Sequence, residues 1–109
     1  MINSAVIVGR TGQDPEMKYF ETGKVKTSFS IAVDRWSKSG KKTDWYRVEL
    51  WDKQAEVAGE YLKKGRLVAV EGRIDINQWT DADGNKREAF LIKGTNMRLL
   101  GSKADMPAE

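Results

Sequence analysis

Apolar and polar residues alternate along most of this 109-residue chain, and glycine, proline and aspartate interrupt the alternation at intervals. This pattern is typical of β-strands that have one face in a core and the other in solvent. In the segment 25–33, for example, every odd-numbered residue except Thr27 is apolar. The segment 53–63 is the one stretch with helical spacing instead. We therefore predict an all-β domain with one short helix.

Turn residues divide the alternating pattern into separate strands. We expect a loop at 37–42, a helix cap at Asp52 and a hairpin turn at Asp83 and Gly84. The order is compatible with a five-stranded oligonucleotide/oligosaccharide-binding (OB) Greek-key barrel, whose short helix lies between strands 3 and 4 and whose long β-hairpins protrude. The expected strands cover 4–10, 17–20, 25–36, 43–51, 66–79 and 88–100, the last interrupted near Gly94.

The chain lacks cysteine and histidine, which excludes disulfides, thiolate nucleophiles, the usual zinc sites and histidine acid-base chemistry. A magnesium-dependent nuclease could use only carboxylates such as Asp44, Glu49, Asp81 and Asp83. These acids are scattered among turns and strand faces, so turn formation and solvation explain them better. We expect no enzymatic activity, no metal and no cofactor. The N-terminus has too short an apolar run for a signal peptide, which favours a cytoplasmic location.

The positive charge is concentrated in one segment. Lysine and arginine total 19 against 16 acids, a net charge of +3. A solvated loop would explain a cationic run alone, but the tryptophans described below favour an anionic partner. The segment 35–47 holds Arg35, Lys38, Lys41, Lys42 and Arg47 against the single acid Asp44.

All four tryptophans fall on the polar phase of their strands. Trp45 and Trp51 alternate with Val48 and Leu50. Trp36 lies on the same side of its strand as the polar Lys26. In the strand 66–79 we expect Val68, Val70, Ile74 and Ile76 to face inward, which places Trp79 on the opposite, polar side. Exposed indoles beside cations suit an unpaired nucleic-acid strand, because indoles stack on bases and cations attract phosphates. An adaptor or RNA-binding module remains an alternative.

Several motifs together resemble the bacterial single-stranded DNA-binding protein family over residues 1–101. Their order and spacing carry the resemblance more than any one of them does. The motifs are NSAVIVGR at 3–10, DPE at 14–16, FSIAV at 29–33, WYRVELW at 45–51, YLKKG at 61–65 and VEGR at 70–73.

The resemblance implies a function and a set of contacts. Trp36, Trp45, Trp51 and Trp79 occupy positions at which the family stacks bases, and Arg47, Lys53 and Lys64 match basic positions along the DNA path. To these we add Arg35, Lys38, Lys41, Lys42 and Arg73 as phosphate contacts. The family implies sequence-independent binding of single-stranded DNA in replication, recombination and repair. It also implies a homotetramer in the bacterial cytoplasm, associated with the nucleoid, or in an organellar equivalent.

Two features depart from the family pattern. We expect an OB domain at 1–101 and a short disordered tail at 102–109 without the family's acidic partner-binding tip. Recruitment of replication and repair proteins is therefore in doubt, and a cut chain and a naturally tailless one both remain open. Asp75 and Asn77 stand where relatives often place basic residues, so this hairpin is expected to hold phosphate more weakly.

Overall fold

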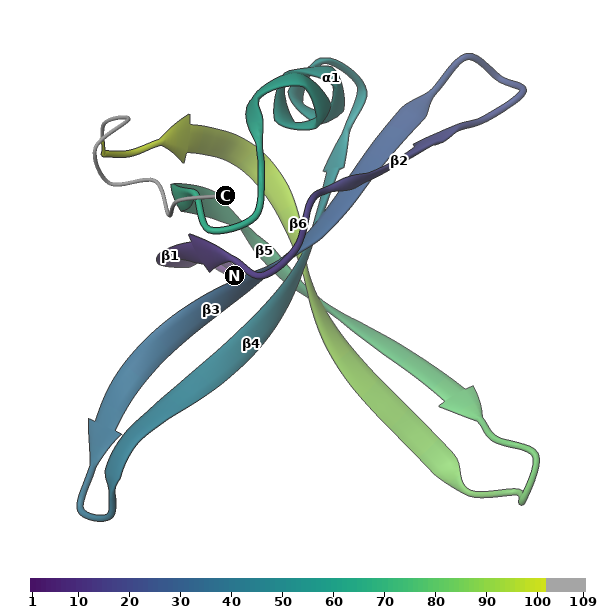
Figure 1. Cartoon of the computed structure of the whole chain (residues 1–109). Helices are drawn as coiled ribbons and strands as arrows, with labels where there is room; N and C mark the ends of the chain where they lie inside the picture. The colour runs from purple at the N-terminus through teal and green to yellow at the C-terminus, as the bar shows by residue number, and fades with distance from the viewer. Residues whose placement is uncertain (102–109) are drawn as a thin grey trace.

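Strands wind into a barrel with one helix at its end in the computed structural model of the chain, which describes residues 1–101 (Figure 1). The elements are β1 (Ala5–Thr11), β2 (Glu16–Tyr19), β3 (Val25–Ser37), β4 (Gly40–Trp51), α1 (Asp52–Tyr61), β5 (Leu67–Thr80) and β6 (Lys86–Leu99). The expected tail at 102–109 lies outside the described residues.

The strand order β1-β5-β6-β4-β3-β2 becomes a closed barrel because β1 also pairs with β3. That closing contact sets Arg10 opposite Ala32 and Thr11 opposite Ile31. The β4–β6 pairing is parallel, and the other pairings are antiparallel. The short β2 lies outside the barrel, so α1 follows the third barrel strand and precedes the fourth. The predicted OB barrel and the place of its helix are confirmed.

Glycine allows β1 to cross β3 closely enough to close the barrel. A Cβ at Gly9 would overlap the backbone carbonyl oxygen of Ala32 and lie 2.7 Å from Cγ2 of Ile31. No side chain fits in that space, which is the usual reason for glycine where two strands approach closely.

The core fills the barrel and extends under α1. Thr27, on the inner face of β3, is fully buried and donates a hydrogen bond of 2.6 Å to the carbonyl oxygen of Ala55 in α1. This bond ties the helix to the barrel wall and satisfies a hydroxyl group that burial would otherwise penalise. The buried apolar residues are Val25, Phe29, Ile31, Val48, Leu50, Ala55, Ala58, Leu62, Val68, Val70 and Ile92.

Both long hairpins continue beyond the core as two-stranded arms (Figure 1). Pairing of β3 with β4 runs to Ser37 opposite Gly40, and pairing of β5 with β6 runs to Thr80 opposite Lys86. We call these the β3–β4 arm (residues 34–47) and the β5–β6 arm (residues 73–93). The predicted protruding hairpins are thus present.

The prediction that Ile74 and Ile76 face inward is wrong, because these side chains are 43% and 56% exposed. They keep the phase of Val68 and Val70, but β5 has left the barrel at this point and no second layer covers its face. A register shift near Gly72 marks the departure, close to the predicted interruption of β6.

The predicted loop at 37–42 is shorter than expected. Strand β3 ends at Ser37 and β4 begins at Gly40, so Lys41 and Lys42 belong to a strand. Gly40 has a φ of +116°, which allows the chain to reverse so tightly.

The predicted turn at Asp83 and Gly84 is confirmed. The Asp81 carboxylate accepts hydrogen bonds from the backbone amides of Asp83 (3.0 Å) and Asn85 (2.9 Å). This is the reason an aspartate begins such a turn.

The predicted cap at Asp52 is wrong. Trp51 occupies the N-cap position without a side-chain hydrogen bond, and Asp52 is the first helical residue, with a φ of +53°. The helix ends at Tyr61, two residues before the predicted end, because Leu62 has already returned to extended geometry.

Candidate nucleic-acid interface

One face of the β3–β4 arm carries two of the predicted tryptophans. Residues directly opposite one another in an antiparallel pair share a face. The register sets Trp36 opposite Lys41, Ala32 opposite Trp45 and Ser30 opposite Arg47. Trp36 and Trp45 are 81% and 62% exposed, as strand phase predicts. We call Trp36, Lys41, Trp45 and Arg47 the stacking face.

Trp51 lies at the root of this arm and is less accessible than predicted. Its side chain is half-buried and stacks on Phe20, with ring centroids 5.5 Å apart and an interplanar angle of 22°. The Lys26 ammonium lies 5.9 Å from the centroid of the Trp51 ring. Strand phase could not reveal this stack, because Phe20 comes from the turn after β2.

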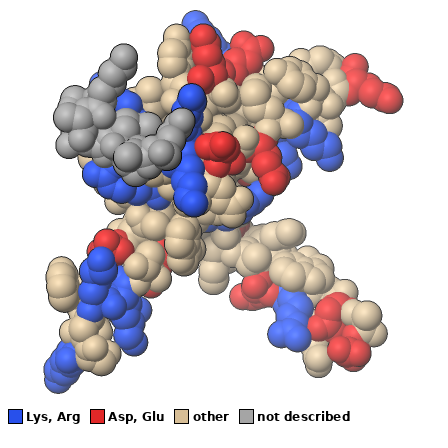
Figure 2. All heavy atoms as spheres, in the orientation of Figure 1, with Lys and Arg blue, Asp and Glu red and all other residues tan. Residues whose placement is uncertain are grey.

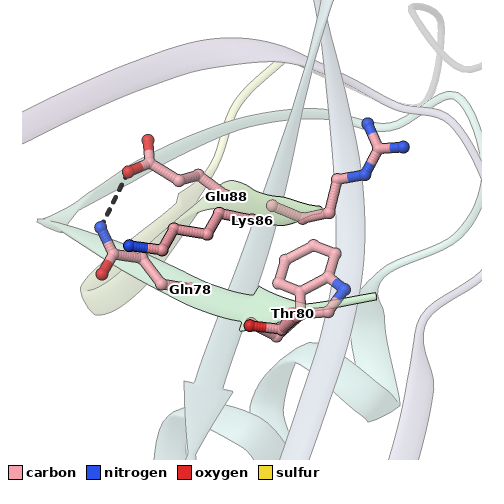
Figure 3. A pocket seen from close by; sticks show the side chains of 6 residues that line it. Gln78, Thr80, Lys86 and Glu88 are labelled. Atoms are coloured by element: carbon pink, nitrogen blue, oxygen red, sulfur yellow. Dashed lines mark hydrogen bonds between the residues drawn. The ribbon is translucent and has the colours of Figure 1, made fainter. Parts of the chain in front are cut away.

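Trp79 lies on the β5–β6 arm, directly opposite Arg87 and 47% exposed. The neighbouring pair, Gln78 and Glu88, points to the other face and is joined by a hydrogen bond of 2.8 Å (Figure 3). A hollow of about 460 Å³ at this position is lined by Gln78, Trp79, Thr80, Lys86, Arg87 and Glu88. Sequence reasoning missed Arg87. A two-residue turn at Asp83 and Gly84 would pair Trp79 with Glu88, whereas the observed pairing of Thr80 with Lys86 leaves a longer loop and sets Arg87 opposite Trp79.

The predicted cations of the β3–β4 arm are divided between its two faces. Lys41 and Arg47 share the stacking face, whereas Arg35 and Lys42 lie opposite each other on the reverse face, and Lys38 occupies the turn. Lys41 and Lys42 were expected to act together in a loop. They belong to a strand instead, where successive side chains point to opposite faces.

Two of these cations already have acidic partners. The Nε of Arg35 lies 2.8 Å from Oδ2 of Asp44, and the Nζ of Lys41 lies 3.6 Å from Oδ2 of Asp34. Both pairs are accessible to solvent, which screens their attraction, so they do not commit either cation to its acidic partner.

The remaining predicted cations lie outside the stacking face. Lys53 is in α1 and Lys64 follows it, and α1 lies at the end of the barrel opposite the arm tips (Figure 1). Arg73 is at the root of the β5–β6 arm, on the same face of β5 as Trp79.

The two arms differ in charge (Figure 2). The β3–β4 arm has five cations against two acids, whereas the β5–β6 arm has four of each. Two acids of the β5–β6 arm are ion-paired, Asp75 with Lys93 at 3.1 Å and Asp81 with Arg87 at 2.8 Å. The expectation that this hairpin holds phosphate more weakly stays a prediction.

Hydrogen bonds at the tip of the β5–β6 arm favour the ionised form of Asp81. The hydrogen bond from Arg87, with those from the amides of Asn85 and Asp83, holds the pKa of Asp81 below its ordinary value. A carboxyl group whose pKa is lowered by folding stabilises the fold above its unfolded pKa, and that contribution disappears as the pH falls through the lowered value. Asp81 therefore stays ionised at neutral pH, and the charge that its hydrogen bonds stabilise is lost only as the pH falls through its lowered pKa.

No group of three or more acids that could hold a metal occurs among residues 1–101. Asp44 and Asp81, two of the acids considered for a nuclease, are instead paired with arginines. The described part of the chain also contains no helix long and apolar enough to cross a membrane.

A second hollow, of about 420 Å³, separates β1 from the arms. It is bordered by apolar residues that sequence reasoning did not select, above all the exposed Phe90, which pairs with Ile76. Its lining comprises Ala5, Ile7, Trp45, Tyr46, Arg47, Ile74, Phe90, Leu91 and Ile92.

The fold and this surface together define an OB barrel with two arms that expose aromatic side chains, one of which is basic. The model of the single-strand binding protein family matches residues 2–100. This chain belongs to that family, a membership that agrees with a binding protein rather than an enzyme.

Two bacterial relatives match over nearly the whole chain. Single-stranded DNA-binding protein 1 of Nostoc sp. is 48% identical over 105 residues, which cover 95% of this chain and 87% of that protein. Single-stranded DNA-binding protein 1 of Synechocystis sp. is 45% identical, covering 95% and 88%. A solved Plasmodium falciparum SSB complex with ssDNA has the same fold, with a TM-score of 0.83, 24% identity and coverage of 93% of this chain and 96% of that one.

The unequal burial of the tryptophans predicts unequal effects on stability. Trp51→Ala should lower the free energy of unfolding by at least about 1 kcal/mol, because it removes the stack on Phe20 and partly buried surface. Trp36→Ala should change it by less than about 0.5 kcal/mol, since that side chain is exposed. Urea unfolding followed by circular dichroism measures both. Equal losses would contradict the described packing.

Proposed function

We propose that this chain binds single-stranded DNA without sequence preference and protects it during replication, recombination and repair. The observation that carries the proposal is the exposure of Trp36, Trp45 and Trp79 on two arms that leave the barrel at the same end. Family membership supports the same function.

Bases and phosphates are held by different groups. Unpaired bases stack on the exposed indoles, and the phosphates between them contact Lys41 and Arg47 on the stacking face. Duplex DNA hides its base faces in its own stack, so the indoles select for unpaired strands. Because any base has a face to stack on, binding does not depend on sequence.

The other predicted residues extend this path. Trp51 offers only the part of its ring that Phe20 leaves exposed, and Lys38 continues the cations to the arm tip. On the β5–β6 arm, Arg73 contacts the phosphates of the strand whose base stacks on Trp79. Arg35 and Lys42 bind a strand that wraps around the reverse face, and Lys53 and Lys64 bind one that continues over the helical end.

We infer that the chain forms a homotetramer. A closed tetramer built from two-fold axes needs two different self-complementary surfaces. Two separate apolar surfaces are exposed: Val6 and Val8 on β1, and Ile74, Ile76 and Phe90 on the β5–β6 arm. Among the described residues, β1 pairs over Ala5–Gly9 only with β5, which leaves its other edge available to a second β1.

The place of action follows from the proposed ligand. Relatives from Nostoc and Synechocystis are bacterial proteins. We therefore infer a location in the bacterial cytoplasm, at the nucleoid, where unpaired DNA arises. Recruitment of other proteins through a tail concerns residues outside the described part.

Tryptophan fluorescence tests the proposed ligand. Titration with poly-dT should quench the emission strongly, whereas duplex DNA should barely change it. Trp45→Ala or Trp79→Ala should weaken poly-dT binding at least about fivefold with the fold intact, since proteins of this kind gain roughly 1–3 kcal/mol per stacked base. Equal quenching by duplex would contradict stacking. Tighter binding to poly-rU than to poly-dT would favour an RNA-binding module.

Salt dependence tests the phosphate contacts. Replacing Lys41 and Lys42 with glutamine should flatten the plot of log affinity against log salt by about 1.4, because each phosphate contact on a single strand contributes about 0.7. Lys24→Gln, at an exposed residue after the turn that follows β2, is the control and should leave the slope unchanged. A change of only about 0.7 would mean that one of the two lysines makes no phosphate contact, and the two single replacements would identify it. No change would remove both from the contact set.

Molecular mass tests the homotetramer. Light scattering should give four chains for the unaltered protein. Val8→Lys or Phe90→Lys should each give dimers, and both together monomers, because a buried lysine is costly in an apolar interface. Tyr61→Lys, at an exposed residue of α1, should leave the tetramer intact. A monomeric unaltered protein would contradict the proposal.

A further inference from the structure

Gly12, in the segment between β1 and β2, lies directly against the six-membered ring of Trp45. A Cβ built on Gly12 would lie 2.9 Å from Cη2 and 3.3 Å from Cε3 of that ring, and it would overlap Cζ3. The indole therefore occupies the space that any other residue at position 12 would need for its side chain.

The backbone beneath the ring is firmly held. The amide of Gly12 donates a hydrogen bond of 3.0 Å to the carbonyl oxygen of Ser30 in β3, and the amide of Thr11 donates one of 3.0 Å to the carbonyl oxygen of Arg66. Thr11 itself is buried. Trp45 thus rests on a fixed segment of the barrel, although it belongs to an arm that leaves the barrel.

Conformational freedom does not explain this glycine. Its φ lies outside the left-handed region, so an L-residue can adopt the same backbone. Nor does it resemble Gly9 and Gly72, where a Cβ would meet a backbone carbonyl group. The nearest atoms to a Cβ at Gly12 all belong to the Trp45 ring.

We propose that Gly12 is a positioning residue for base stacking: its lack of a side chain seats the Trp45 ring against the barrel and fixes the direction in which its exposed surface faces. The inference rests on the proposed binding of single-stranded DNA. The ring atoms concerned are at the far end of a side chain, so a methyl group at position 12 displaces the indole while the backbone stays in place.

The test is Gly12→Ala, measured by poly-dT titration at constant salt. Affinity should fall roughly threefold to tenfold, because a displaced ring keeps only part of a stack that is worth at least about fivefold. Acrylamide quenching of tryptophan in the unbound protein should change as well, since the ring moves before any ligand arrives. Gly59→Ala is the matched control: its Cβ would meet only the Met17 side chain, and neither readout should change.

A double-mutant cycle with Trp45→Phe isolates the contact. A phenyl ring is too short to reach the position of Cζ3, so Gly12→Ala should change affinity by less than about 1.5-fold in that background. If the single variant Gly12→Ala does not fold, recovery of folding in the Trp45→Phe background supports the same contact. Failure to fold in both backgrounds would overturn it.

Other outcomes are equally decisive. Unchanged affinity in Gly12→Ala, or an equal loss in both backgrounds, would mean that Gly12 does not act through Trp45. The unaltered protein is titrated alongside, so absence of binding there would reveal failure of the proposed function. If the unaltered protein binds poly-dT and Gly12→Ala binds it equally well, only the role of Gly12 is rejected.

Discussion

Closure of the barrel by β1 is the constraint on which the rest of the structure depends. Strand β1 pairs with β5 along most of its length and reaches β3 at Arg10 and Thr11, which is possible because Gly9 has no side chain. Once the barrel is closed, its interior admits only the core residues and the apolar side of α1. The remaining lengths of β3–β4 and β5–β6 must leave the barrel as two-stranded arms, and the arms carry the exposed tryptophans.

In the proposed function, the two arms contribute differently to the binding of a strand. The β3–β4 arm has an excess of cations and two highly exposed indoles, so we expect it to supply most of the salt-dependent attraction. The β5–β6 arm is neutral overall, and its acids are engaged with its own cations at Asp75 and Asp81. We therefore expect it to contribute stacking on Trp79 with little dependence on salt. A flexible single strand can follow both arms, whereas a stiff duplex with hidden base faces cannot.

Period-two alternation explains both what could be predicted from the sequence and what could not. It assigned the faces of Val25–Val33 and of Trp45 correctly, because a strand with one buried side leaves a clear pattern. The same alternation placed Ile74 and Ile76 inward, since a pattern cannot tell whether a second layer covers that face. Reading residues 37–42 as a loop concealed the separation of Lys41 from Lys42. The stack of Phe20 on Trp51 and the contact of Gly12 with Trp45 join distant segments, so no local signal marks them.

The central claim is that bases, stacked on exposed tryptophans, contribute much of the affinity that phosphates alone would not provide. An abasic oligonucleotide of the same length as an oligo-dT strand tests this claim most directly, because it keeps every phosphate and removes every base. At one salt concentration, the abasic strand should bind at least tenfold more weakly and leave tryptophan emission nearly unchanged, given roughly 1–3 kcal/mol per stacked base in proteins of this kind. Equal affinity for the two strands would contradict the account.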